Sequence, residues 1–373
     1  MNVHNSRLAQ TVRYLEAEGL DGLVALNYGL NSFLEPHAVF VLSGVRPIGE
    51  SAVLVDRGGA STLMVTPAWE AERAAALSRT ARTIGTDDLA QALADAIAAH
   101  GIDPRKTVTV GLSTLGLGLV RGIEAVLGGT VRANDSYARE LARIRAPEEL
   151  AAAQKATWIA ERGYERFLSF ARPGLREFEL AAELYCFMKE LGAEDNFLLL
   201  SASQHNLAVT AAGARVLDVG DIILSEITPC YQGQFAQICR TTVIGEAAPL
   251  LHEKYAVLQQ AMRCGQAAAV PGASVRAVTQ SMDDCLRAAG YGDYCRPPYM
   301  RVRGHGLGIT SDAPGDLTVD SDARLEDGMV FVMHPNQYLP ETGYLMCGEP
   351  VVITPGGAKA LSERSATLDS ITV

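Results

Sequence analysis

The sequence predicts two domains of mixed helix and strand, with a boundary close to residue 140. A chain of 373 residues is long for a single hydrophobic core, so two domains are the first expectation. In the first part, short strand patterns alternate with helical ones, which indicates a sheet covered by helices, an α/β domain. A strongly helical stretch begins near residues 135–149. We therefore expect an α/β domain over residues 1–140 and a second domain over residues 141–373.

The elements of the first domain are predicted from the spacing of its apolar residues. Residues 7–18 carry Leu8, Val12 and Leu15 at helical spacing, and Gly19 follows them, which indicates a helix. Apolar runs that lack this spacing and end in glycine or proline turns predict buried strands. The other elements expected here are strands over 21–28, 50–56, 61–67 and 108–116 and helices over 68–77 and 88–100.

The second domain is predicted to begin with helices and to continue with strands. Pro147 is followed by Glu148 and Glu149, an arrangement that is favourable in the first turn of a helix. The helical pattern is interrupted at Pro173 and Gly174 and continues to about residue 191. The elements expected beyond it are strands over 196–201, 299–304, 328–335 and 345–354, a hairpin over 220–245, and helices over 250–269 and 274–289.

The composition is that of an ordinary globular protein and argues against several partner classes. Hydrophobic residues make up 48% of the chain and charged residues 20%. The formal net charge of −11 disfavours nucleic acid and anionic membranes as partners. The polar N-terminus and the lack of a long apolar stretch predict a cytoplasmic protein without a membrane span. The seven cysteines are scattered without a metal-binding spacing, and we expect reduced thiols.

The most informative segment is the hairpin expected at residues 220–245, GDIILSEITPCYQGQFAQICRTTVIG, with its turn at Gly233. It resembles the hairpin that carries the first metal ligands in methionine aminopeptidases, prolidases and aminopeptidase P. Each strand of that hairpin carries an aspartate, whereas this chain has Glu226 and Gln237 at the two positions. A neutral amide cannot supply the negative charge that holds two divalent cations close together.

Five further segments resemble the creatinase/aminopeptidase P group and follow in the order typical of that family. They are RLAQTVRYLEAEGLDGLVALNYGLNSFL, ELARIRAPEELAAAQKA, RPGLREFELAAEL, RGHGLG and LEDGMVFVMHPNQY. The chain is therefore identified as a creatinase-like member of the M24-type, pita-bread family. The resemblance implies an α/β N-terminal domain, a pseudo-symmetric α+β pita-bread C-terminal domain that holds the active site, and a homodimer.

In the metal-dependent members, two Asp, one His and two Glu bind a pair of metal ions. Carried over by position, these ligands fall on Glu226, Gln237, His305, His334 and Gly348, with Glu349 beside the last position. Because only the histidine keeps its type, we expect a site depleted of metal ligands, with no metal and no other cofactor. A site for one metal ion, built from His305, His334 and Glu226, is the alternative.

The ionisable groups that remain predict acid–base chemistry. Ile222, Leu224 and Glu226 share one face of a strand, so the carboxylate is expected to point to the core or to a pocket. A histidine beside a carboxylate can act as base and as acid near neutral pH, which the protonation of a leaving nitrogen requires. We therefore assign catalysis to His305, His334 and Glu226.

Further residues are expected to bind a small-molecule substrate. They are Gln237, Asp312, Glu349 and His205 in the second domain, and Phe33, His37 and Arg46 in the first. In creatinase-like dimers, the N-terminal domain caps the pocket of the partner, which is the reason for including the last three. An arginine near a pocket commonly indicates a substrate that carries a carboxylate.

Together these assignments favour a metal-independent hydrolase that acts on a non-peptide C–N bond of a small polar nitrogen compound, as creatinase and ectoine hydrolases do. Two alternatives stay open. A metal-independent lyase, isomerase or cyclase would use the same acid–base groups. An aminopeptidase-like hydrolase with one metal ion, or a non-catalytic member, would use the same fold.

Overall fold

The computed structural model describes residues 3–29, 33–34, 37–129 and 131–373. The chain divides into two compact units, Met1–Ala142 and Arg143–Val373. Clusters of buried hydrophobic residues lie within the N-terminal unit and, separately, within the C-terminal unit. Each unit therefore has its own hydrophobic interior.

A six-stranded sheet in the order β4-β3-β2-β1-β5-β6 forms the centre of the described N-terminal unit. Antiparallel pairing joins β1 to β2 and β2 to β3, and parallel pairing joins the other neighbours. The strands are β1 (Gly22–Asn27), β2 (Ser51–Asp56), β3 (Ser61–Val65), β4 (Arg82–Gly85), β5 (Thr107–Val110) and β6 (Arg132–Ala133). The middle strands are buried nearly throughout, as expected of a sheet with both faces covered.

Helices of the N-terminal unit begin and end at residues suited to those positions. The α4 helix follows Asp88, whose carboxylate accepts a hydrogen bond from the backbone N–H of Gln91, and it ends at Gly101 in the left-handed conformation. Its buried side chains, Leu89, Leu93 and Ile97, join the core over the sheet. The helices are α1 (Val3–Ala17), α2 (Ala38–Ser43), α3 (Ala71–Leu77), α4 (Leu89–His100), α5 (Leu117–Val126) and α6 (Ser136–Ala142).

The strand predicted over 108–116 is shorter than expected because Gly111 ends it. Gly111 has a φ of 88°, and a Cβ atom there would lie 2.3 Å from the carbonyl oxygen of Leu26. Only glycine accommodates that turn and that close approach. A short 3₁₀ helix, Leu112–Thr114, follows in place of the rest of the strand.

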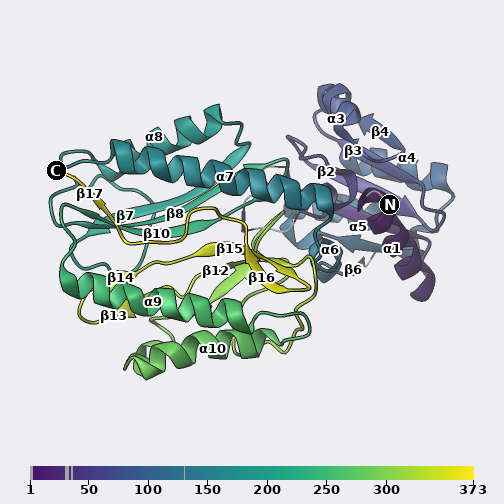
Figure 1. Ribbon diagram of the computed structural model, residues 1–373. Helices are drawn as coiled ribbons and strands as arrows, with labels where there is room; N and C mark the ends of the chain where they lie inside the picture. The colour runs from purple at the N-terminus through teal and green to yellow at the C-terminus, as the bar shows by residue number, and fades with distance from the viewer. Residues whose placement is uncertain (1–2, 30–32, 35–36, 130) are drawn as a thin grey trace. The chain divides into compact units, whose positions relative to one another are not determined.

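The C-terminal unit consists of strands enclosed between two pairs of helices. Figure 1 shows α7 and α8 over the sheet β17-β10-β8-β7, and α9 and α10 over the sheet β11-β12-β15-β16. The helices are α7 (Pro147–Phe170), α8 (Glu177–Glu190), α9 (Pro249–Ala268) and α10 (Val275–Ala288). The α7 helix begins at Pro147, and the carboxylate of Glu149 accepts a hydrogen bond from the N–H of Ala146, so the predicted start is observed.

The two larger sheets of this unit meet at a β-bridge between Cys239 and Gly348, and β13 and β14 form a small third sheet. The strands of the first sheet are β7 (Asp195–Ser203), β8 (Ile222–Tyr231), β9 (Gln234–Phe235), β10 (Ile238–Ile244) and β17 (Asp369–Ile371). The others are β11 (Gly304–Gly306), β12 (Val330–Met333), β13 (Gln337–Leu339), β14 (Gly343–Leu345), β15 (Glu349–Thr354) and β16 (Gly357–Ala360). The bridge brings the predicted hairpin, β8 and β10, beside β12 and β15.

Two strands of this unit differ in extent from the prediction. The strand expected at 299–304 overlaps β11 only at Gly304, and residues 299–303 are not part of a strand. The strand expected at 345–354 is divided into β14 and β15, since residues 346–348 leave one sheet to reach the bridge with Cys239.

The expectation of seven reduced cysteines is wrong for two of them. Cys264 on α9 and Cys285 on α10 form a disulfide that joins the two helices, and the other five cysteines form no disulfide among the described residues. The spacing of 21 residues gave no signal for this pair, because the two helices become neighbours only through tertiary packing.

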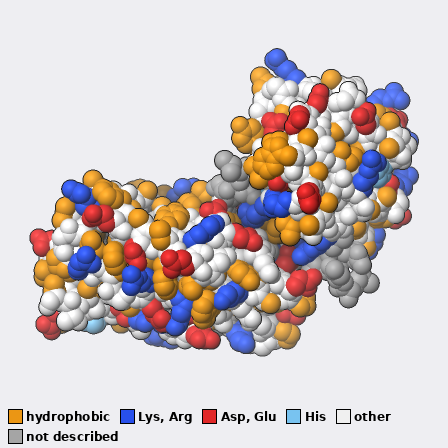
Figure 2. Space-filling view, turned by 90° about the horizontal axis from the view of Figure 1, so that it is seen from above, with side chains coloured by type: hydrophobic (Ala, Val, Ile, Leu, Met, Phe, Trp, Pro, Cys, Tyr) orange, Lys and Arg blue, Asp and Glu red, His pale blue; other side chains and the backbone are white. Residues whose placement is uncertain are grey.

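Surface charge and helix hydropathy agree with the composition. On the face shown in Figure 2, basic and acidic side chains are interspersed over both units. In the part of the chain that the structure describes, every helix is too short or too polar to cross a membrane.

Candidate active site

The structure brings Glu226, Gln237, His305 and His334 into one region of the C-terminal unit. Glu226 on β8 lies opposite Cys239 on β10, and Cys239 forms the bridge to Gly348. The ring centroids of His305 and His334 are 5.3 Å apart. A Cβ atom at Gly348 would lie 2.9 Å from the Cβ of His334, so the imidazoles adjoin the bridge.

Among the described residues, no basic side chain forms an ion pair with the carboxyl group of Glu226. Glu226 lies in the middle of β8, between Leu199 on β7 and Cys239 on β10, and its Oε1 is 4.0 Å from the Sγ of Cys239. Burial raises the pKa of Glu226 to about 7. The group therefore exists both protonated and ionised near neutral pH, which suits proton transfer.

Gln237 presents an amide to the same region. Its side chain is buried, and its Nε2 donates to the Sγ of Cys239 at 3.5 Å. Its Oε1 has no hydrogen-bond partner among the described residues. Burial, followed by the charge of Glu226, raises the pKa of Cys239 well above its usual range, so this thiol is a packing group and not a thiolate.

Both imidazoles are neutral at physiological pH. Burial, followed by the neighbouring His305, lowers the pKa of His334 to about 3. Burial also lowers the pKa of His305, whose Nδ1 donates to the carbonyl oxygen of Gly306 at 2.8 Å. That bond fixes the proton of neutral His305 on Nδ1. The buried Nδ1 of His334 has no hydrogen-bond partner among the described residues.

Tyr344 belongs to this region as well. Burial, followed by the charge of Glu226, raises the pKa of its phenol, which therefore stays protonated and can donate a hydrogen bond. Tyr344 lies opposite Tyr338 in the β13–β14 pair. The alternation of Gly343–Leu345 is too short to predict this placement from sequence.

The structure places the other predicted residues of the C-terminal unit elsewhere. Asp312 accepts a hydrogen bond from the hydroxyl of Thr310 within its own loop. His205 contacts the carbonyl oxygen of Pro340 at 3.0 Å and packs against Tyr338, with ring centroids 5.8 Å apart. Its described contacts are with the β13–β14 segment and not with the imidazole pair.

Glu349 faces away from the imidazoles. Neighbouring residues of an extended chain point to opposite faces, and Gly348 is the one that faces His334. The carboxylate of Glu349 pairs with Arg240 at 3.0 Å and accepts a hydrogen bond from Ser362. Among the described residues, Glu349 is therefore the acidic partner in a buried ion pair.

Phe33, His37 and Arg46 belong to the N-terminal unit and have local roles there. Phe33 and His37 are buried, and the imidazole of His37 accepts a hydrogen bond from the N–H of Phe40 at the start of α2. The guanidinium carbon of Arg46 lies 5.1 Å from the ring centroid of Phe40.

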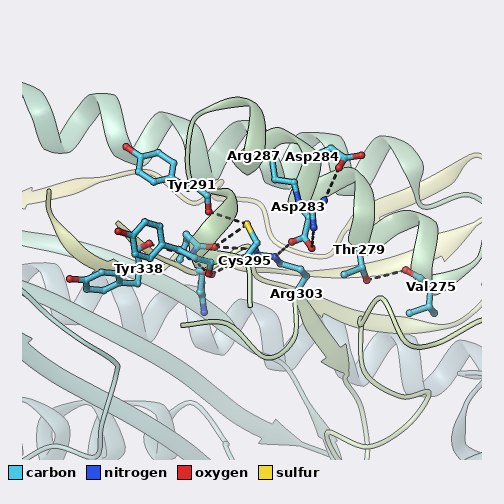
Figure 3. A network of polar contacts seen from close by, with 12 residues as sticks. Val275, Thr279, Asp283, Asp284, Arg287, Tyr291, Cys295, Arg303 and Tyr338 are labelled. Atoms are coloured by element: carbon cyan, nitrogen blue, oxygen red, sulfur yellow. Dashed lines mark hydrogen bonds and ion pairs between the residues drawn. The ribbon is translucent and has the colours of Figure 1, made fainter. Parts of the chain in front are cut away.

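A buried ion pair holds the segments that carry the imidazoles. Arg303 is 1% exposed, and its Nε donates to the carboxylate of Asp283 on α10 at 2.6 Å (Figure 3). Its Nη atoms donate to the carbonyl oxygen of Asn336 and to the side chain of Gln337. The backbone oxygen of Arg303 accepts a hydrogen bond from the N–H of His334 at 3.0 Å. Arg303 was not predicted as a site residue, because its partners are distant in sequence.

The residues of this region do not fit the metal pair that the resemblance implies. Glu226 supplies at most one negative charge, Gln237 and the imidazoles supply none, and position 348 has no side chain. Among the described residues, no group of three or more His, Cys, Asp or Glu side chains is arranged to hold a metal ion. Space is lacking too, because a Cβ at position 348 would lie 2.7 Å from Cys239.

Comparison with known proteins identifies the family and the fold. The model of metallopeptidase family M24 matches residues 151–355. An Xaa-Pro dipeptidase of Pyrococcus furiosus is 26% identical over 369 residues, which cover 97% of this chain and 99% of that protein. The uncharacterized peptidase YqhT of Bacillus subtilis is 31% identical over 233 residues, which cover 61% of this chain and 65% of YqhT.

Solved structures agree in fold. The Xaa-Pro dipeptidase from Bacillus anthracis superposes with a TM-score of 0.85 at 22% identity, over 98% of this chain and 99% of that chain. The predicted fold class is confirmed, an α/β N-terminal domain followed by an α+β pita-bread domain.

The predicted function is wrong in two respects. A non-peptide C–N hydrolase of the creatinase type was expected, but relatives that align over nearly the whole chain are named Xaa-Pro dipeptidases, and dipeptidases PepE also match. The prediction of a metal-independent enzyme is contradicted as well, because the matching family is one of metallopeptidases.

Proposed function

Because this chain belongs to metallopeptidase family M24, we propose that it acts on short peptides and that its substrate is a dipeptide of the Xaa-Pro type. The relatives from Pyrococcus furiosus and Pyrococcus horikoshii that support this class align with 97% and 99% of the chain. Both are named Xaa-Pro dipeptidase. A dipeptide is also small enough to be recognised by a few convergent polar groups.

Two buried polar atoms of this chain carry the proposal. The Oε1 of Gln237 and the Nδ1 of His334 have no hydrogen-bond partner among the described residues, and both lie close to Cys239 and Gly348. Buried polar atoms are normally paired, so such atoms favour a ligand that pairs with them. A dipeptide offers both complements, since its ammonium group can donate to Gln237 and its carbonyl group can accept from His334.

The charge state of the region suits a peptide bond. The same region holds neutral imidazoles, an amide, a phenol and Glu226, whose pKa is about 7. A peptide unit is uncharged, and an Xaa-Pro unit has a carbonyl group but no N–H. The nitrogen of a departing proline needs a proton, and Glu226 is the group that can hold and deliver one near neutral pH.

The test is hydrolysis of Ala-Pro and Met-Pro compared with Ala-Ala and Pro-Ala, followed by mass spectrometry of the released amino acids. The protein is assayed as purified and with added Mn²⁺ or Co²⁺, so that the outcome does not depend on its metal content. We expect release of proline from the Xaa-Pro dipeptides. Glu226→Gln should lower kcat/KM by roughly a hundredfold or more, because it removes the group that transfers the proton.

Glu190→Gln is the matched control, since Glu190 is an exposed residue of α8. It should leave turnover unchanged. If no dipeptide is cleaved under any metal condition, and calorimetry detects no binding of Ala-Pro, the proposal is refuted.

We further propose that the protein is a homodimer, as the resemblance to creatinase-like proteins implies. Light scattering on the purified protein should then give twice the chain mass of 39.7 kDa. A mass equal to that of one chain at micromolar concentration would contradict this assembly. The cytoplasmic location stays a prediction.

A further inference from the structure

Thr228 on β8 carries a buried hydroxyl group whose Oγ1 has no hydrogen-bond partner among the described residues. The residue is 0% exposed. It follows Glu226 by two positions on the same strand, so the two side chains point to the same face of the sheet. Cys239, which lies opposite Glu226, belongs to that face as well. The hydroxyl group is therefore an unpaired polar group on the face that carries the candidate active site.

Gln237 lies directly across from Thr228. The register of the hairpin is the same before and after this position, and the flanking pairs are Phe235 with Cys230 and Ile238 with Ile227. Counted inward from either pair, position 237 falls opposite position 228. Opposed residues of an antiparallel pair share one face, with Cβ atoms roughly 5 Å apart. The side chains of Thr228 and Gln237 are therefore neighbours in one row of the sheet.

The Oε1 atom of Gln237 is the second unpaired oxygen in this row. The side chain is 1% exposed, its Nε2 donates to the Sγ of Cys239 at 3.5 Å, and its Oε1 has no partner within the described parts of the chain. The thiol of Cys239 in turn lies 4.0 Å from the Oε1 of Glu226. These contacts use the amide nitrogen and leave the amide oxygen available. Because a buried oxygen without a partner is costly, two of them in one row favour a ligand that donates to both.

Solvent reaches this face of the sheet beside the two oxygen atoms. On β7, Phe197 lies opposite Thr228 and Leu199 lies opposite Glu226. Phe197, Leu199 and Glu226 are each partly exposed. A small molecule that lies on Phe197 and Leu199 is therefore adjacent to the row formed by Thr228 and Gln237.

We propose that Thr228 and Gln237 form a subsite for a primary ammonium group, so that the substrate must have a free amino terminus. This inference rests on the proposed function and specifies which group of the dipeptide the row recognises. An ammonium group has three N–H donors and can donate to the hydroxyl and to the amide oxygen at once. An acylated nitrogen keeps at most one N–H and leaves an oxygen unpaired. Glu226 occupies the next row on the same face, which places an acidic group where it can offset the charge of a bound cation.

The two rows correspond to the two nitrogen atoms of a dipeptide. Successive side chains on one face of a strand are roughly 7 Å apart, so one small molecule can contact both rows. The amino nitrogen of a dipeptide is three bonds from the nitrogen of its peptide bond. An ammonium group held between Thr228 and Gln237 therefore directs the peptide nitrogen toward the row of Glu226, the group that holds the proton for it.

The experiment is an NMR titration of the full chain labelled with ¹³C at the leucine methyl groups. Leu199 lies opposite Glu226 and reports on this face of the sheet, and Leu199→Met assigns its signal. The probe is L-alaninamide, which has a primary ammonium group, and N-acetyl-L-alaninamide is the matched compound without it. We expect a saturable shift of the Leu199 signal with the first compound and none with the second.

Thr228→Val removes the hydroxyl group at almost unchanged size and should weaken the affinity for L-alaninamide by roughly tenfold or more. Gln237→Met, which removes the amide oxygen, should weaken it as well. Thr242→Val is the matched control, since the hydroxyl of Thr242 on β10 bonds to the hydroxyl of Tyr164 at 2.8 Å. It should leave the titration unchanged and lower Tm, whereas Thr228→Val should not lower Tm, because its hydroxyl has no partner to lose among the described residues.

Three outcomes would overturn the proposal. They are an affinity for L-alaninamide that is the same in Thr228→Val, an equal response to the acetylated compound, and a loss of Tm in Thr228→Val as large as in Thr242→Val. Cleavage of Ala-Pro with an unchanged kcat/KM in Thr228→Val would also refute the subsite and would leave the proposed function standing. Binding of L-alaninamide that depends on Thr228, without cleavage of any dipeptide, would support the subsite and refute the proposed function.

Discussion

At the level of single residues, Glu226 links the stability of the protein to pH. Its pKa is raised from the ordinary value of 4.5 to about 7, because burial penalises the ionised form. Between these two values, the folded protein binds a proton that the unfolded chain has released. Stability is therefore expected to fall as the pH rises through this range, and the full penalty applies above pH 7.

Glu226→Gln should remove this penalty. We expect the variant to be more stable than the wild type by about 3 kcal/mol at pH 8, and to lose most of this advantage at pH 4.5, where the carboxyl group is protonated in the folded state and only half ionised in the unfolded chain. Urea denaturation at the two pH values measures the difference. An identical advantage at both values would show that the ionisation of Glu226 is not its cause, and Glu190→Gln should show none.

Sequence reasoning could place residues on regular strands and could not place those held by distant partners. Strand alternation correctly grouped Ile222 and Leu224 as core residues on the same side as Glu226. It had no means of identifying Arg303, whose partner Asp283 lies 20 positions away on a helix. It also could not predict the orientation of Glu349. That orientation depends on the ion pair with Arg240, a residue far away in the sequence that only the tertiary fold brings close.

At the level of secondary-structure elements, one ion pair connects α10 to β11 and to the segment after β12. Asp283 lies on α10, and Arg303 immediately precedes β11 and holds Asn336 and Gln337. Figure 3 shows Arg287 on the outer side of the same carboxylate, at 3.4 Å. The inner contact is buried and the outer one is half exposed, so the two arginines should differ greatly in their contribution.

Arg303→Met should lower the free energy of unfolding by about 3–5 kcal/mol, because it leaves the carboxylate of Asp283 buried without its partner. Arg287→Met is the control and should cost about 1 kcal/mol or less. Urea denaturation at pH 7 gives both values. Adding Asp283→Asn to Arg303→Met should recover part of the loss, and the lack of any recovery would contradict the role assigned to this pair.

Long helices with a regular amphipathic pattern were predicted closely. Elements whose ends depend on a single turn were not. The helices expected at 88–100, 250–269 and 274–289 correspond to α4, α9 and α10 within one residue at each end. The strand expected at 108–116 ended early at Gly111, where a carbonyl group approaches closely. Such close approaches depend on the packed structure and leave little trace in the local sequence.

At the level of the whole molecule, the two units have separate hydrophobic interiors. Leu26 is buried in the core of the N-terminal unit, and Leu258 is buried in a core of the C-terminal unit. Two substitutions that each create a cavity, one in each core, are expected to act independently, because the free-energy costs of distant substitutions usually add. The two units should therefore respond separately to a loss of core packing.

Leu26→Ala and Leu258→Ala should each cost about 2–5 kcal/mol. Hydrogen exchange measured by mass spectrometry should show faster exchange within residues 3–142 for the first variant and within residues 143–373 for the second. Faster exchange across the whole chain in either variant would show that the two units unfold together.

The crowding at Gly348 also restricts the substitutions that this position accepts. A side chain at position 348 would need Cys239 and His334 to move or become smaller, because even a Cβ atom lies within 3 Å of both. Gly348→Ala alone is therefore expected to strain the bridge between the two sheets, and a larger side chain would be accepted only together with changes at its neighbours.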